Sequence, residues 1–145
     1  MSEIVIARAA AVVLRAGHLL LSRNADDPFW SLPGGRIEPG ECAEETLSRE
    51  IAEELGVGSA QIGTLLWRIE NPFTHSGRRY RETGFYYRVV LAAEACPLVE
   101  GEFAGPEPHL RLRWFPLAEL ADVDLRPAVL RERLTALSHP AGSLS

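Results

Sequence analysis

The chain has 145 residues, of which 46% are hydrophobic and 24% charged, and a formal net charge of −5. This length predicts a single domain over residues 1–145 that can bury a sizeable core, and the negative charge disfavours a nucleic-acid partner, which needs a basic face. The apolar runs are too short to cross a membrane and the N-terminus lacks a secretory signal, so a cytoplasmic location is expected.

The first part of the chain predicts strands and turns. Residues 4–14 are rich in Val, Ile and Ala and are expected to form a strand. Ala16-Gly17 is a turn signal, after which residues 18–23 return as the second strand of a hairpin. A polar loop over residues 24–28 leads to a short extended segment that ends in Gly34-Gly35.

Residues 42–55 change to helical spacing. Ala43, Leu47, Ile51 and Leu55 recur every four residues and form an apolar stripe, and Gly56 is placed to end the helix. The rest of the chain alternates between strand and loop signals before it ends in helical ones. The expected elements are strands over residues 61–70, 80–91 and 110–115, loops over 71–79 and 96–108, and helices over 117–121 and 127–137. Strands on both sides of one long helix predict an α/β fold.

Several kinds of site are disfavoured by residue usage. All 15 basic residues are arginine, which excludes mechanisms that need a lysine, such as a P-loop phosphate clamp or a Schiff base. Cys42 and Cys96 form no C-x-x-C pair, so a thiolate zinc site is not expected. The four histidines show no metal-ligand spacing.

Three glutamates lie on one face of the predicted helix. Glu50, Glu53 and Glu54 stand at i, i+3 and i+4, and like charges at these spacings do not stabilise a helix by themselves. A hard divalent cation such as Mg²⁺ or Mn²⁺ resolves the repulsion, because it prefers oxygen ligands and bridges to substrate phosphates. From these acids alone, a metal site and a solvated acidic face both stay open.

The segment around these glutamates resembles the Nudix box, G-x5-E-x7-R-E-U-x-E-E-x-G-U, in which U is a bulky aliphatic residue. Every specified position matches, and the matching residues are Gly35, Glu41, Arg49, Glu50, Ile51, Glu53, Glu54, Gly56 and Val57. Residues 32–35 and 113–117 also resemble flanking segments of the family, which extends the likeness over most of the chain.

The resemblance implies a Nudix-type α/β/α sandwich with a mixed central sheet, and a pyrophosphohydrolase that depends on Mg²⁺, with Mn²⁺ as the alternative. Such an enzyme cleaves a phosphoanhydride bond of a nucleoside diphosphate linked to another group, as in an NTP, a nucleotide sugar or ADP-ribose. The competing interpretation is a catalytically silent Nudix domain that binds a nucleotide or a metal as a sensor. Degenerate domains lose acids of the box, and this chain keeps them all, which favours the enzyme.

The resemblance also implies roles for individual residues. Arg49 is expected to pair with acids such as Glu41 and to hold the carboxylates in place. The general base stays open between Glu50 and Glu53. The implied metal ligands are Glu50, Glu53, Glu54 and the backbone carbonyl of Gly34.

The sequence departs from the family pattern ahead of Trp114, where many relatives carry a further acid. Arg111 occupies that place, so either a loop acid (Glu82, Glu102 or Glu107) substitutes or Arg111 contacts phosphate directly.

Basic and aromatic side chains outside the box are candidates for binding a nucleotide-type small molecule. A locally basic patch consists of Arg68, His75, Arg78, Arg79 and Arg81, and the aromatic candidates for stacking on a base are Phe29, Trp30, Trp67, Phe73 and Tyr80. The expected substrate-binding residues are Arg23, Arg78, Arg79 and Arg111. A membrane partner is not expected, and the sequence leaves a homodimer open.

Overall fold

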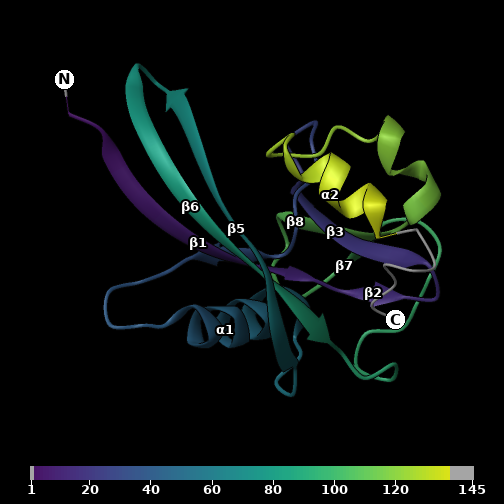
Figure 1. Ribbon diagram of the computed structural model, residues 1–145. Coiled ribbons are helices and arrows are strands. Elements are labelled where there is room, and N and C mark those ends of the chain that lie inside the picture. The colour runs from purple at the N-terminus through teal and green to yellow at the C-terminus, as the bar shows by residue number, and fades with distance from the viewer. Residues whose placement is uncertain (1, 138–145) are drawn as a thin grey trace.

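The computed structural model describes residues 2–137, which form two four-stranded sheets and three helical segments (Figure 1). In chain order the elements are β1 (Ile4–Val12), β2 (Leu14–Arg15), β3 (His18–Asn24), β4 (Gly34–Arg36), α1 (Ala43–Leu55), β5 (Gln61–His75), β6 (Arg78–Val90), β7 (Phe103–Ala104), β8 (Leu110–Pro116), the 3₁₀ helix η1 (Leu117–Asp122) and α2 (Leu130–Ala136). Within the described residues, no helix is both long and apolar enough to span a bilayer.

The first sheet has the strand order β4-β1-β6-β5 and the second the order β2-β3-β8-β7. Strand β1 pairs with β6 in parallel and with β4 antiparallel, so the first sheet is mixed, whereas the second is antiparallel throughout. The expected mixed α/β fold is confirmed. The turn predicted at Ala16-Gly17 is also confirmed, because both residues have positive φ, 48° and 75°, as a tight hairpin requires.

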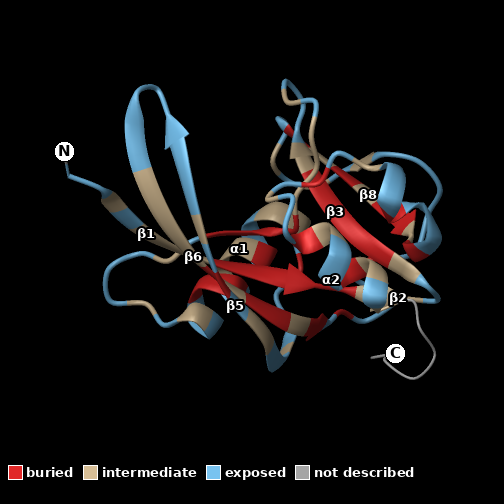
Figure 2. Ribbon diagram, turned by 45° about the horizontal axis from the view of Figure 1, so that its top comes forward, coloured by how far each residue is buried: buried red, intermediate tan, exposed pale blue. Residues whose placement is uncertain are grey.

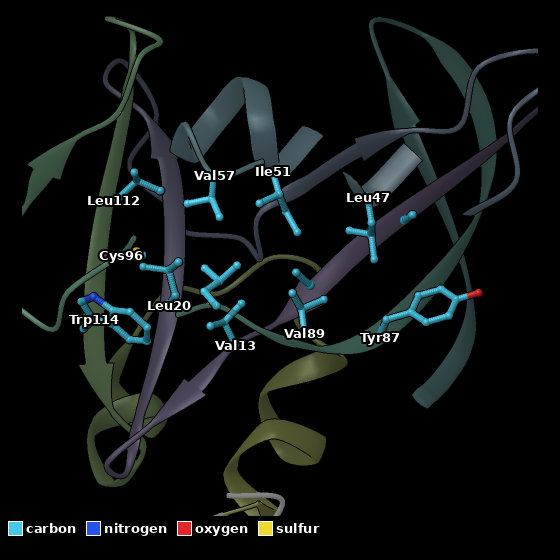
Figure 3. Packing of buried hydrophobic residues seen from close by; sticks show 13 residues of the cluster. Val13, Leu20, Leu47, Ile51, Val57, Tyr87, Val89, Cys96, Leu112 and Trp114 are labelled. Carbon is cyan, nitrogen blue, oxygen red and sulfur yellow. The ribbon is translucent and has the colours of Figure 1, made fainter. Parts of the chain in front are cut away.

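The hydrophobic core lies on both faces of β1. Ala9 and Ala11 pack on one face with Leu47 and Ile51 of α1, as Figure 3 shows for the two helix residues. Ala10 belongs to the other cluster, which also contains Leu125, Leu130 and Leu134. Because successive side chains of a strand point to opposite faces, a strand buried on both sides needs the continuous apolar run that the sequence shows.

Helix α1 forms as its spacing predicts. Leu47 and Ile51 are fully buried and point into the core, while the two ends of the stripe are partly buried. The helix ends at Gly56, whose φ of 73° is left-handed and whose N–H donates to the Ala52 carbonyl at 3.1 Å. The stop signal in the sequence is therefore confirmed.

The loop expected over residues 71–79 is wrong. Strand β5 continues to His75 and β6 begins at Arg78, so the turn is only Ser76-Gly77. Residues 4–7, 70–75 and 78–83 form a three-stranded arm that projects from the body, and its exposed colouring in Figure 2 contrasts with the buried strands behind it. The segment is polar because little covers the arm, although the backbone still pairs as a strand.

Two smaller expectations also change. The region expected as a loop over residues 96–108 contains β7, which pairs with β8 through Phe103 and Ala104. The last helix is shorter than expected, since α2 covers Leu130–Ala136 rather than residues 127–137.

Candidate active site

The candidate site lies along the edge of β4 that faces away from β1. Ala11 N–H donates to the Pro33 carbonyl at 2.8 Å and Ile37 N–H to the Ala7 carbonyl at 2.9 Å. In an antiparallel pair these bonds alternate, so the backbone groups of Gly34 and Arg36 point outward, away from β1. Side chains of helix α1 form hydrogen bonds with this edge. Gly34 N–H donates to Glu54 Oε1 at 3.1 Å, and Arg49 Nη2 donates to the Arg36 carbonyl at 3.3 Å.

Glu54 is the most perturbed carboxyl of the site. Burial and the neighbouring charge of Glu50 raise the pKa of Glu54 to about 8, with a smaller contribution from Glu107. Arg8 and the hydrogen bond from Gly34 oppose this rise but do not cancel it. Burial and the charge of Glu53 also raise the pKa of Glu50. These shifts indicate that the neighbouring positive charges do not fully offset the repulsion between the carboxylates and the cost of burying them.

The double glycine before the box allows two close approaches. A Cβ on Gly35 would lie 2.1 Å from Glu50 Oε2, so the carboxylate packs directly on the glycine backbone. A Cβ on Gly34 would lie 2.1 Å from the Ala9 carbonyl oxygen, and Gly34 has a φ of 153°. Neither position accepts a side chain without displacing Glu50 or strand β1.

Arg49 is the centre of the hydrogen-bond network, and its predicted pairing with Glu41 is confirmed. Its Nε and Nη2 donate to the two oxygens of Glu41 at 2.7 and 3.0 Å. Its Nη1 donates to Glu50 Oε2 and to Glu53 Oε1, both at 3.1 Å. The hydrogen bonds from Arg49 lower the pKa of Glu41 to about 2, and Glu41 in turn raises the pKa of the guanidinium. A bidentate pair of this kind fixes the rotamers of both partners.

The donor set fits a hard divalent cation. The edge of β4 brings together glutamate carboxylates and an outward backbone carbonyl at Gly34, which are the oxygen ligands that Mg²⁺ prefers. As the side chains stand, however, no three His, Cys, Asp or Glu residues between positions 2 and 137 are arranged around one point. Glu50 and Glu53 instead accept hydrogen bonds from Arg49. To bind a cation together with Glu54, their carboxylates would have to give up these hydrogen bonds.

The predicted substrate-binding arginines lie in two other places. Arg23 and Arg111 are opposite each other in the β3–β8 pairing. Arg23 donates to both Glu102 oxygens at 3.0 and 3.1 Å, and Arg111 Nη1 donates to the Pro108 carbonyl at 2.9 Å. These contacts leave both guanidinium groups on the second sheet rather than among the box carboxylates.

Arg78 and Arg79 lie at the tip of the arm (Figure 1). Ala10 pairs with both Gly34 and Tyr86, so Tyr86 lies level with the start of the Nudix box. The distance from the two arginines to the box is therefore about their distance from Tyr86 along β6. From Tyr86 to Arg79 the strand extends by about 23 Å at about 3.3 Å per residue. Within one chain, these two arginines are therefore not brought to the carboxylates.

Two further residues lie near the carboxylates: Arg8, which the sequence did not single out, and Glu107, which was one of its three candidate loop acids. Arg8 donates to the Leu32 carbonyl at 3.3 Å, and its positive charge acts on both Glu50 and Glu54. Glu107 lies close enough to Glu54 to raise its pKa, which favours it over Glu102 and Glu82 as the acid outside the box. The one signal for Arg8 in the sequence is a charge inside an otherwise apolar strand.

Comparisons with known proteins agree with this geometry. Residues 5–135 match the model of the NUDIX domain. A Mycobacterium tuberculosis protein provisionally named 8-oxo-dGTP diphosphatase 2 is 31% identical over 132 residues, which cover 88% of this chain and 83% of that protein. A Bacillus subtilis protein with a similar provisional name is 49% identical over 55 residues, 36% of this chain and 37% of that protein. Another M. tuberculosis relative is matched over 34% of its length, so the chain spans about a third of these last two. The solution structure of the E. coli ORF135 protein superimposes with a TM-score of 0.65 at 28% identity, covering 99% of this chain and 96% of that one.

Proposed function

The chain belongs to the NUDIX family, and from this premise we propose that it is a metal-dependent pyrophosphohydrolase. Its substrate is a nucleoside diphosphate linked to another group, and water cleaves the phosphoanhydride bond. The observation that carries the proposal is the Arg49 network, which holds Glu41, Glu50 and Glu53 beside the half-buried Glu54. A solvated acidic helix face needs neither a half-buried glutamate with a raised pKa nor a glycine that makes room for a carboxylate.

In this proposal Glu50, Glu53, Glu54 and the Gly34 carbonyl hold Mg²⁺, for which Mn²⁺ can substitute. When bound, the cation neutralises the phosphate oxygens and stabilises the leaving group. Arg49 acts through the carboxylates, because its hydrogen bonds keep Glu41 and Glu50 in fixed rotamers. Either Glu50 or Glu53 removes the proton from the attacking water.

The substrate phosphates are proposed to lie on the Arg8 side of the carboxylates. Arg8 supplies a positive charge next to Glu50 and Glu54 without belonging to the box. Arg23 and Arg111 lie on the neighbouring sheet, and in the proposal they contact the part of the substrate beyond the diphosphate. Arg78 and Arg79 can contribute only if the substrate or a second chain brings the arm tip to the site.

The proposed substrate class includes nucleoside triphosphates, nucleotide sugars, dinucleoside polyphosphates and ADP-ribose. Among the relatives, provisional 8-oxo-dGTP diphosphatases extend over most of the chain, and a B. subtilis protein provisionally named ADP-ribose pyrophosphatase matches 62% of it. Triphosphates, including oxidised purine forms, are therefore the first compounds to test.

A phosphate-release screen over these compounds with Mg²⁺ or Mn²⁺ tests the proposal. The wild-type chain should hydrolyse at least one class, and a Glu53→Gln, Glu54→Gln double variant should lose turnover while remaining folded. Turnover by the double variant near the wild-type rate would refute the assignment of the carboxylates. Tight nucleotide binding without any product from the wild type would support the sensor interpretation instead.

A further inference from the structure

One face of the arm carries a continuous apolar row. Ile4 pairs with Tyr80 and Tyr80 pairs with Phe73, so the three residues stand side by side across β1, β6 and β5. The rings of Phe73 and Tyr80 stack with centroids 5.0 Å apart and planes at 7°. Ile6 follows two positions along β1 and points to the same face. We call this surface, formed by Ile4, Ile6, Phe73 and Tyr80, the arm face.

The arm face continues the side of the sheet that is buried elsewhere. Farther along, Ala10 and Tyr86 on this side belong to the cluster with Leu125 and Leu130. That covering layer stops short of the arm, which Figure 2 shows as exposed and intermediate residues. Phe73 is 37% exposed. A contiguous apolar surface on an otherwise amphipathic ribbon is typical of an interaction site.

The opposite face of the arm is mostly polar, and part of it is ion-paired, although Val5 on this face is 70% exposed. Arg81 Nε donates to Glu3 Oε1 at 3.0 Å, and Arg81 lies 3.7 Å from Glu70. The β5 edge of the arm is a poor surface for pairing, because Pro72 has no N–H to donate to a further strand. The arm face is the surface of the arm on which apolar side chains of all three strands lie together.

Charges along β6 indicate which partner fits this face. Arg78, Tyr80 and Glu82 alternate onto it, so a positive charge, an aromatic ring and a negative charge follow in order. Neither Arg78 nor Glu82 makes an ion pair with another residue in the part of the chain that the structure describes. Consider two arms stacked face to face about a twofold axis that lies in the plane between them, perpendicular to β6 and level with Tyr80. The β6 strands of the two copies then run in opposite directions, which reverses this order. The axis brings Arg78 of one copy over Glu82 of the other, twice in the pair.

We propose that two copies of this chain associate through their arm faces, with the twofold axis at Tyr80 and reciprocal ion pairs between Arg78 and Glu82. The stacked Tyr80 and Phe73 rings of the two copies form the apolar centre of the interface, and the ion pairs fix its register. The inference does not rest on the proposed function, since it uses no residue of the Nudix box.

Sedimentation velocity over a concentration series tests the proposal. The wild type should sediment as a dimer, and Arg78→Glu or Glu82→Arg alone should raise the dissociation constant at least about tenfold, because each places two like-charged contacts in the interface. The Arg78→Glu, Glu82→Arg double variant should recover the wild-type dimer. The matched control is Arg79→Glu, which makes the same charge change on the other face of β6 and should remain dimeric.

Mixing the two single variants gives a sharper test. Each is expected to be monomeric alone, but an equimolar mixture should form a heterodimer in which both contacts are again of opposite charge. Circular dichroism spectra that match the wild type would show that the variants are folded. The proposal would be overturned if the wild type were monomeric at every concentration. This holds also if the arm face of that monomer bound a nucleotide base instead. Folded variants whose mixture fails to associate would overturn it as well.

Discussion

Replacement of Glu54 by glutamine is expected to stabilise the metal-free protein and to abolish the proposed activity. Burial and the charge of Glu50 raise the pKa of Glu54 from 4.5 to about 8. Below pH 4.5 both the folded and the unfolded chain carry the proton, whereas between 4.5 and about 8 only the folded chain does. The folded state then binds more protons than the unfolded state, so its stability falls as pH rises through this interval. Glutamine keeps the acceptor for the Gly34 N–H and does not titrate.

The size of the effect follows from the same two values. The interval from 4.5 to about 8, at about 1.4 kcal/mol for each factor of ten in proton affinity, gives an upper bound of about 5 kcal/mol. Water reaching the rim of the site and movement of the carboxylate reduce the cost of the charge, so we expect about 2 kcal/mol. The variant and the wild type should thus unfold with similar free energies near pH 4.5 and differ most above pH 8.

Urea unfolding followed by tryptophan fluorescence, with a metal chelator present, measures this difference. The matched control is Glu132→Gln, which neutralises an exposed glutamate of α2 and should show no such dependence on pH. Equal unfolding free energies for Glu54→Gln and the wild type across the whole pH range would refute the reasoning. A glutamine variant whose unfolding free energy falls relative to that of the wild type as pH rises would refute it as well.

Four other outcomes are expected. Gly35→Ala should lower kcat at least about 100-fold with little change in the urea midpoint, because the new methyl group displaces only the carboxylate of Glu50. Arg49→Lys should lower kcat by about 10- to 100-fold in a Mg²⁺ titration, since lysine cannot donate to both oxygens of Glu41. Arg8→Ala should raise KM about tenfold with a smaller effect on kcat if Arg8 binds substrate phosphate, and an unchanged KM would remove that role. Saturating Mg²⁺ should raise the calorimetric unfolding temperature of the wild type by the equivalent of about 1–3 kcal/mol, and no change at any concentration would count against the cation site.

The sequence predicts the local parts of this structure well. The spacing of Leu47 and Ile51 fixes the buried side of α1, and Gly56 fixes its end, because both depend only on helix geometry and backbone freedom. The pairing of Arg49 with Glu41 is also predicted, through the resemblance to the Nudix box. These features lie within one continuous segment, where a pattern can be interpreted without knowledge of the rest of the fold.

The features that the sequence did not predict depend on long-range pairing. Arg8 reaches the carboxylates only because β1 lies beside β4. The sequence named Glu107 only as one of three candidate acids, and the choice among them depends on the segment between β7 and β8, which passes near the end of α1. Residues 71–75 and 78–79 of the arm were mistaken for a loop because polarity indicates solvent exposure rather than a lack of backbone pairing. The partial burial of Glu54 likewise depends on elements that are distant in sequence.

The parallel pairing of β1 with β6 has a consequence for how the chain folds. Ile4 is paired with Tyr80, and Val12 with Arg88, so this contact joins segments 76 residues apart (80 − 4). Closing so long a loop is slow compared with forming α1 or the β2–β3 hairpin. During synthesis, the apolar residues Ala9 to Val13 leave the ribosome well before β6 exists to pair with them. The nascent chain therefore presents this apolar segment before its partner strand exists, and the segment is where a chaperone or a misfolded neighbour can bind.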